Sequence, residues 1–173
     1  MEKPKFVYAT YIRTTPEKLW QALTEPEFTR RYWCATWQES DWKPSSSWQI
    51  MIPDGRVAVS GEIIEIEPHR RLVLSWRNEF KPELRAEGYS RLTYELEKQG
   101  DLVKLTVIHD TDKPGSKFIE SVSSGWPLIL ASLKSLLETG ESLEATRIWP
   151  EGGCKKPGEY TMREQGTLEG VPR

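Results

Sequence analysis

The stretch SKFIESVSSGWPLILASLKSLLETG, residues 116–140, contains the pattern that predicts the one long helix of this sequence. Ser116 is suited to the N-cap, and Gly140 is suited to the left-handed conformation that ends a helix. Pro127 lacks the amide hydrogen that a helix interior needs, so we predict a kink there or a helix that begins only near Ser124. The apolar residues recur at alternating spacings of three and four, which marks one helical face that needs a partner surface. This face consists of Ile119, Val122, Trp126, Ile129, Leu130, Leu133, Leu136 and Leu137.

Length and composition predict a soluble single domain. A chain of 173 residues can bury a sizeable core. Its 24 basic and 26 acidic residues give no strong positive field, so neither nucleic acid nor a membrane surface is expected as a partner. No signal-peptide core or membrane-length apolar run occurs, which predicts a cytoplasmic protein. Two cysteines and two histidines are too few for a disulfide framework or a four-ligand zinc site, and we expect no metal or cofactor.

The sequence before the long helix predicts a sheet with two short helices near its start. A first strand over residues 6–13 is followed by Thr15-Pro16-Glu17, a helix start, and then by a second helix that carries Phe28 and Tyr32. Short turns between later strands predict antiparallel neighbours, and hence an α+β fold whose sheet curls around the final helix. The later strands are expected at residues 36–39, 48–52, 57–67, 72–77, 89–97 and 102–110.

Two segments depart from this regular pattern. The connection over residues 77–88 is long enough to form a flap instead of a turn. Beyond the long helix the composition changes to glycine, proline and charge. We therefore predict one domain over residues 1–141 and an irregular tail over residues 142–173 that is dispensable for the fold.

A series of short motifs in a fixed order resembles a known family, the bacterial homologues of the activator of heat-shock protein 90 ATPase. This family belongs to the START-like, or SRPBCC, group, and the resemblance covers about residues 5–143. The motifs are Thr15-Pro16-Glu17, Leu19-Trp20, Leu23-Thr24, Phe28-Thr29, Tyr32-Trp33, Ser40-Asp41-Trp42-Lys43, Asp54-Gly55, Arg71-Leu72-Val73, Ser75-Trp76, Ser124-Gly125-Trp126-Pro127 and Leu133-Lys134-Ser135-Leu136-Leu137.

The resemblance implies a helix-grip fold, in which a curved antiparallel sheet clasps a long C-terminal helix. It also implies a cavity between sheet and helix, which in many relatives takes apolar small molecules or lipids. Members of the group bind hormones and lipids, act as cyclases or assist a chaperone, so the shared fold does not choose one function. The implied partners are a small apolar or amphipathic molecule, a chaperone or other protein, and a second copy of the chain.

Aromatic residues are the candidates for the cavity wall, because several of them share strand faces with aliphatic residues. The alternative is that each ring only fills the core. Gly61 is added because it lacks a side chain where one would intrude into the space between sheet and helix. The aromatic candidates are Trp33, Trp48, Trp76, Tyr94 and Trp126.

His109 extends the apolar row of the strand at residues 102–110. One interpretation is a polar group at the cavity wall that orients a ligand or transfers a proton. The other is a strand-end histidine hydrogen-bonded to backbone.

Three functional hypotheses follow from these features. The first is a binding module for a small apolar or amphipathic molecule, the second is a partner-binding protein related to the chaperone activators, and the third is an enzyme acting on a cavity-bound substrate. A cavity of roughly 300 Å³ or more would favour the first over the second. A titratable partner for His109 inside the cavity would favour the third.

Overall fold

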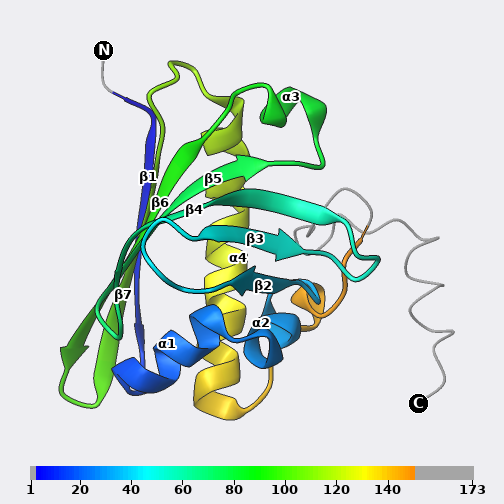
Figure 1. Cartoon of the computed structure of the whole chain (residues 1–173). Coiled ribbons are helices and arrows are strands. Elements are labelled where there is room, and N and C mark those ends of the chain that lie inside the picture. Colours follow the sequence, from blue (N-terminus) through cyan, green and yellow to red (C-terminus); the bar gives the residue numbers. More distant parts are fainter. Residues whose placement is uncertain (1–2, 151–173) are drawn as a thin grey trace, which may run out of the picture.

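The computed structural model describes residues 3–150 and contains one curved sheet wrapped around a long helix (Figure 1). The sheet has seven strands in the order β1-β7-β6-β5-β4-β3-β2, and every neighbouring pair is antiparallel. The strands are β1 (Lys5–Ile12), β2 (Trp37–Ser40), β3 (Ser47–Met51), β4 (Val57–Glu67), β5 (Arg71–Asn78), β6 (Ser90–Gln99) and β7 (Leu102–Asp110). All seven predicted strands are present.

The helices are placed as the helix-grip fold requires. Two short helices, α1 and α2, follow the first strand, and the long helix α4 lies in the hollow of the sheet (Figure 1). Within the described residues, no helix is long and apolar enough to cross a membrane. The helical elements are α1 (Pro16–Thr24), α2 (Pro26–Tyr32), α3 (Pro82–Arg85), α4 (Lys117–Thr139) and the single 3₁₀ turn η1 (Glu144–Thr146). The expected α+β helix-grip architecture is confirmed.

Both ends of α4 have the predicted caps. The Ser116 hydroxyl accepts a hydrogen bond from the amide of Ile119 at 3.1 Å. Gly140 adopts φ 85°, and its amide donates to the carbonyl of Leu136 at 2.9 Å. The helix runs without interruption through Pro127, so the alternative start near Ser124 does not occur.

The inner face of the sheet and α4 share one core. In β7 the predicted alternation is observed, because Val103, Leu105, Val107 and His109 are all fully buried. The ladder between β4 and β5 is irregular after Ile63, and such irregularities bend a strand. The bend helps the sheet to curl around the helix.

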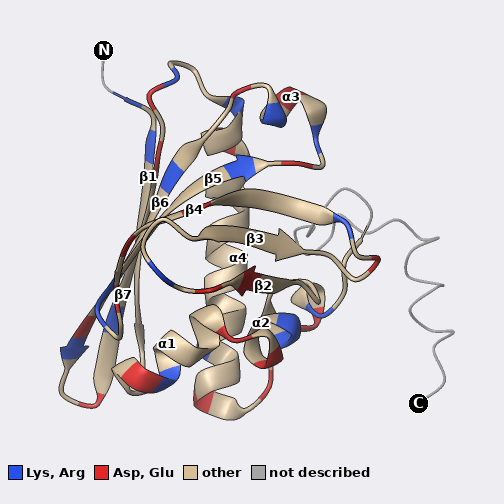
Figure 2. Ribbon diagram, in the orientation of Figure 1, with Lys and Arg blue, Asp and Glu red and all other residues tan. Residues whose placement is uncertain are grey.

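Charged residues are spread over the whole fold. In Figure 2, basic and acidic segments occur on strands, helices and connections and do not gather on one element. Arg71 of β5 forms ion pairs with Glu65 of β4 at 3.1 Å and with Glu95 of β6 at 2.5 Å. These pairs cross three adjacent strands on the solvated side, as expected for a sheet with one wet face.

The connection between β5 and β6 is held against the start of α4. It contains the short helix α3, which the sequence did not predict, and Glu87 lies between this helix and β6. The Glu87 carboxylate accepts hydrogen bonds from the Ser116 hydroxyl and from the amides of Lys117 and Phe118, at 2.7, 2.8 and 3.1 Å. The expected flap is thus fixed at one end.

The segment after α4 differs from the irregular, dispensable tail that we expected, as far as it is described. Thr146 is fully buried, and its hydroxyl lies 2.6 Å from that of Ser132 on α4. The carbonyl of Thr146 accepts from the amide of Cys34 at 2.7 Å. Trp149 then packs edge-on against Phe80, 5.3 Å between ring centroids. The domain boundary at residue 141 remains a prediction, and most of the expected tail lies outside the described residues.

Candidate functional site

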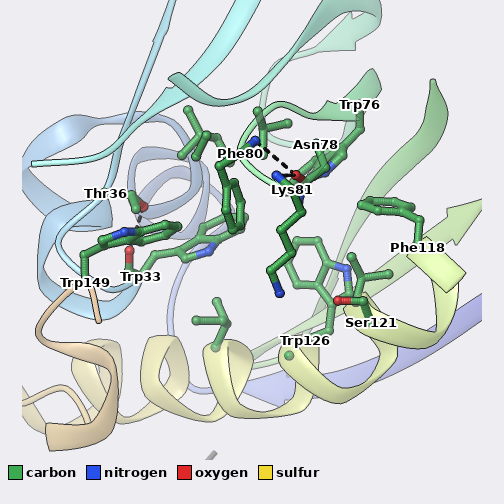
Figure 3. A pocket seen from close by; sticks show the side chains of 16 residues that line it. Trp33, Thr36, Trp76, Asn78, Phe80, Lys81, Phe118, Ser121, Trp126 and Trp149 are labelled. Atoms are coloured by element: carbon green, nitrogen blue, oxygen red, sulfur yellow. Dashed lines mark hydrogen bonds between the residues drawn. The ribbon is translucent and has the colours of Figure 1, made fainter. Parts of the chain in front are cut away.

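A pocket of about 160 Å³ opens between α4 and the strands β3, β4 and β5 (Figure 3). Its walls come from segments that are far apart in sequence, and most of the lining side chains are apolar or aromatic. Exposed Ser121 on α4 and half-buried Lys81 after β5 mark its mouth. The lining residues are Trp33, Thr36, Ile50, Ala58, Val59, Trp76, Asn78, Phe80, Lys81, Phe118, Ser121, Val122, Gly125, Trp126, Ile129 and Trp149.

The end of α2 positions Trp33 at one wall. The amide of Trp33 donates to the carbonyl of Thr29 at 2.9 Å, which completes the last helical turn. Cys34 and Ala35 then take positive φ values of 51° and 60°, and the chain reverses. The Thr36 hydroxyl donates back to the Trp33 carbonyl at 2.6 Å. This tight turn, which costs conformational strain, fixes the direction of the Trp33 ring.

Trp76 is the centre of the aromatic packing. Its ring lies 6.1 Å from that of Trp33, 6.0 Å from that of Trp126 and 5.3 Å from that of Trp48. The Trp33 and Trp126 rings also meet edge-on at 5.2 Å. Stacked, tilted and edge-on pairs all occur here, and they form a packed aromatic cluster in the wall.

Three of the seven sequence-predicted site residues line this pocket, namely Trp33, Trp76 and Trp126. Trp48 and Tyr94 lie behind it, and both are about 1% exposed. The Trp48 indole N–H donates to Gln38 Oε1 at 2.8 Å. The Tyr94 ring meets Trp126 edge-on at 6.0 Å, and burial raises the pKa of its hydroxyl well above the ordinary value. These two rings support the wall from the core side.

His109 also lies behind the pocket wall, and its contacts define its tautomer. The Trp126 indole N–H, which can only donate, points at Nδ1 of His109 at 3.2 Å. The proton of neutral His109 is therefore on Nε2, which lies 2.8 Å from the Ser90 hydroxyl. Ser90 in turn donates to the carbonyl of Trp76 at 3.2 Å. These hydrogen bonds run from the Trp126 ring through the side chains of His109 and Ser90 to the backbone of Trp76. The described partners of His109 are thus side chains and not the backbone group that we had considered.

Burial lowers the pKa of His109 to about 3, so the ring is neutral at ordinary pH. Its described hydrogen-bond partners are Ser90 and Trp126, neither of which is an acid or base near neutral pH. A titratable partner for His109 inside the cavity would have favoured an enzyme, and the described residues contain no such hydrogen-bond partner. The geometry instead assigns His109 the role of orienting the Trp126 ring.

The structure explains a glycine at position 61 differently from our expectation that Gly61 leaves space between sheet and helix. A β-carbon at this position would lie 1.8 Å from the carbonyl oxygen of Ser75 on the neighbouring strand. The glycine therefore permits a close approach of two backbones where the ladder between β4 and β5 is interrupted. Gly61 is not among the residues that line the pocket.

The glycine that leaves space in the pocket is Gly125, which sequence reasoning did not select. A β-carbon there would meet no atom within 4 Å, and Gly125 lines the pocket from α4. Sequence reasoning also missed Phe80, Lys81 and Trp149. The first two lie in the flap, and Trp149 lies after the helix, so no periodic pattern placed these residues near the cavity.

The polar groups of the lining are mainly hydrogen-bond donors. Asn78 is buried, and its Oδ1 already accepts from the amides of Phe80 and Lys81, at 3.1 and 2.8 Å. Lys81 Nζ lies 5.7 Å from the centroid of the Phe80 ring. Figure 3 shows the Lys81 side chain running from the rim across the pocket toward α4. Among residues 3–150, no cluster of three or more potential metal ligands is found.

The curved sheet, the long helix and the aromatic pocket between them define a helix-grip protein. Residues 13–138 match the family described as "Activator of Hsp90 ATPase homolog 1-like protein". The chain belongs to this family, as the resemblance of its motifs predicted.

Solved structures show the same fold. A protein of Mesorhizobium loti is 23% identical with a TM-score of 0.66, over 78% of this chain and 96% of that one. A protein of Cytophaga hutchinsonii is 27% identical with a TM-score of 0.64, over 81% of this chain and 98% of that one. The Aha1 dimer from Colwellia psychrerythraea is 17% identical with a TM-score of 0.62, over 80% of this chain and 98% of that one. A search of curated proteins found no match.

Proposed function

We propose that this protein binds a small apolar or amphipathic molecule in the pocket between the sheet and α4. The observation that carries the proposal is the open space beside Gly125, in an otherwise close-packed aromatic core. Protein interiors are normally filled to crystal-like density, and large rings next to an unfilled space are typical of ligand sites. Membership of a helix-grip family supports the same function.

The volume restricts the size of the ligand. About 160 Å³ is below the roughly 300 Å³ that drug-sized ligands require. It is close to the ~150 Å³ of an engineered apolar cavity that binds benzene. The ligand we propose is therefore about one ring in size, and any further part of it projects from the mouth of the pocket. This is smaller than the longer apolar chains that the fold alone would allow.

The test is to fill the pocket from the helix. Gly125→Leu places an aliphatic side chain in the open space and also raises helix propensity. We expect it to abolish the change in tryptophan emission that cyclohexanol produces in the wild type, with the fold intact by circular dichroism. Ser124→Leu, at the exposed neighbouring position, is the control and should bind like the wild type. Equal cyclohexanol binding by Gly125→Leu, or none by the wild type, would contradict the proposal.

A second candidate function is partner binding of the chaperone-activator type. The family match favours this function. The pocket volume of about 160 Å³ is also below the roughly 300 Å³ that would have favoured a small-molecule binding module over a partner-binding protein. The expected partners are a chaperone of the heat-shock protein 90 class and a second copy of this chain.

This candidate predicts that the purified protein raises the ATPase rate of such a chaperone. It also predicts that the Gly125→Leu variant does so as well as the wild type, because its surface is unchanged. Analytical ultracentrifugation would measure the dimer independently. Loss of ATPase stimulation in Gly125→Leu would connect the activity to the pocket and not to the surface.

A further inference from the structure

The pocket has an uneven polarity that points to the chemistry of its ligand. No aspartate or glutamate is among the described residues that line it, although acidic residues outnumber basic ones in the whole sequence, 26 to 24. Lys81 is the one lining side chain with a formal charge. The one formal charge on the described lining is therefore positive, in a protein whose net charge is −2.

Lys81 extends into the pocket, and no described carboxylate forms an ion pair with it. Two acidic residues of the same connection have other partners: Glu79 pairs with Arg77 and Arg85, and Glu87 accepts hydrogen bonds from the start of α4. The described contact of the ammonium group is the Phe80 ring, at 5.7 Å from the centroid. A cation over an aromatic face is a modest interaction, and a carboxylate would bind the same ammonium more strongly.

A second, independent observation concerns Trp149. Its indole nitrogen Nε1 is buried, and no described residue accepts its hydrogen bond. A buried donor without an acceptor is unfavourable and rare in folded proteins. Trp149 lines the same pocket as Lys81, and its unpaired N–H is consistent with a bound molecule that carries acceptor atoms.

We propose that the pocket takes a small monocyclic carboxylate, with its ring among Trp33, Trp76 and Trp126 and its carboxylate paired with Lys81. This inference rests on the proposed function and adds the chemical class of the ligand's polar group, a carboxylate. The ring matches the volume of about 160 Å³, and the acidic head group matches a lining whose one formal charge among the described residues is that of Lys81.

The experiment compares ligands of one shape and different charge. Cyclohexanecarboxylate, its neutral amide and cyclohexylmethylamine are titrated into the full-length protein by calorimetry, with tryptophan emission as a second signal. We expect the carboxylate to bind at least roughly tenfold more tightly than the amide, because both accept a hydrogen bond from the Lys81 ammonium but only the carboxylate adds an opposite charge. The amine should bind weakest, because it meets the Lys81 ammonium.

A variant then assigns the difference to one side chain. Lys81→Met keeps the length and apolar stem of the lysine and removes its charge. We expect it to bind carboxylate and amide equally, because no ammonium group remains to pair with a carboxylate. Lys98→Met, at an exposed position of β6 outside the lining, removes the same net charge and should keep the wild-type preference.

The outcomes separate this inference from the function on which it rests. Equal binding of carboxylate and amide by the wild type, or a preference that persists in Lys81→Met, overturns the carboxylate inference and leaves the ligand pocket in place. If no member of the series binds while the protein is folded, the proposed function fails and the inference fails with it.

Discussion

At the scale of single residues, His109 connects the core to the pocket. It accepts a hydrogen bond from Trp126 and donates one to Ser90, so a histidine fixes the direction of a pocket ring without facing the pocket. Burial lowers its pKa to about 3, compared with 6.5 for the ordinary side chain. Protonation of the folded state would have to remove the hydrogen bond that Nδ1 accepts.

This arrangement predicts a defined dependence of stability on pH. Between pH 6.5 and about 3 the unfolded chain binds a proton at His109 and the folded chain does not, so the free energy of unfolding falls as the pH falls through this range. The stabilisation is complete above pH 6.5, and the loss is on the order of 5 kcal/mol. His109→Gln, which can make both hydrogen bonds, should be about 1 kcal/mol less stable at pH 7. Because glutamine does not titrate, urea unfolding at several pH values should show the wild type losing this advantage in acid and becoming less stable than the variant, and parallel curves would contradict the assignment.

Two glycines provide a matched pair at the same scale. Gly125→Ala should stabilise the protein by about 0.5–1 kcal/mol, because alanine is the better helix residue and its β-carbon enters open space. Gly61→Ala should destabilise it by at least about 1–3 kcal/mol, because its β-carbon would lie 1.8 Å from the Ser75 carbonyl oxygen. Thermal unfolding of both variants measures the difference. A stable Gly61→Ala protein would show that β4 and β5 can separate at this point.

At the scale of elements, Glu87 couples the flap to α4. Partial burial raises the pKa of its carboxyl, but the hydrogen bonds from Ser116, Lys117 and Phe118 together outweigh this effect and hold the pKa below its ordinary value. These donors belong to the first turn of α4, where the helix dipole also favours a negative charge. The flap that carries Phe80 and Lys81 is thereby fixed relative to the helix wall of the pocket.

Glu87→Gln should therefore lower stability by about 1–2 kcal/mol, because a neutral amide offers one acceptor oxygen where the carboxylate offers two. The difference should be present above the ordinary carboxyl pKa and shrink as the pH falls through the lowered pKa of Glu87. Hydrogen exchange should show faster opening of the amides of Lys117 and Phe118. Unchanged exchange at these amides would mean that Ser116 alone caps the helix.

The sequence was sufficient for the elements whose signals are local. The caps Ser116 and Gly140, the alternation in β7 and the two prolines that start α1 and α2 predicted their elements directly. The pocket was predicted only in part, because its shape depends on contacts between distant segments. Gly61 and Gly125 look alike in sequence, and only the position of the Ser75 carbonyl distinguishes them. Helix α3 and the packing of Thr146 carry no periodic pattern that would predict them.

At the scale of the whole molecule, the pocket is a meeting point of segments from both ends of the chain. Trp33 comes after α2, Phe80 from the flap, and Trp149 from the segment that follows α4. Thr146 connects two of these segments, because its carbonyl binds Cys34 and its hydroxyl contacts Ser132. The segment after the helix is thus part of the wall that closes the pocket.

Truncation after Gly140 tests this role, and the structure reverses the expectation that such a truncation is harmless. It removes buried Thr146 and leaves the amide of Cys34 and the hydroxyl of Ser132 without their partners, so we expect a loss of more than about 2 kcal/mol. It also removes the Trp149 wall, so cyclohexanol binding should weaken even where the truncated protein is folded. Truncation after Pro150, which keeps every one of these contacts, is the control. Equal melting temperatures of the two truncated proteins would show that the fold ends with α4, as the composition of the sequence predicts.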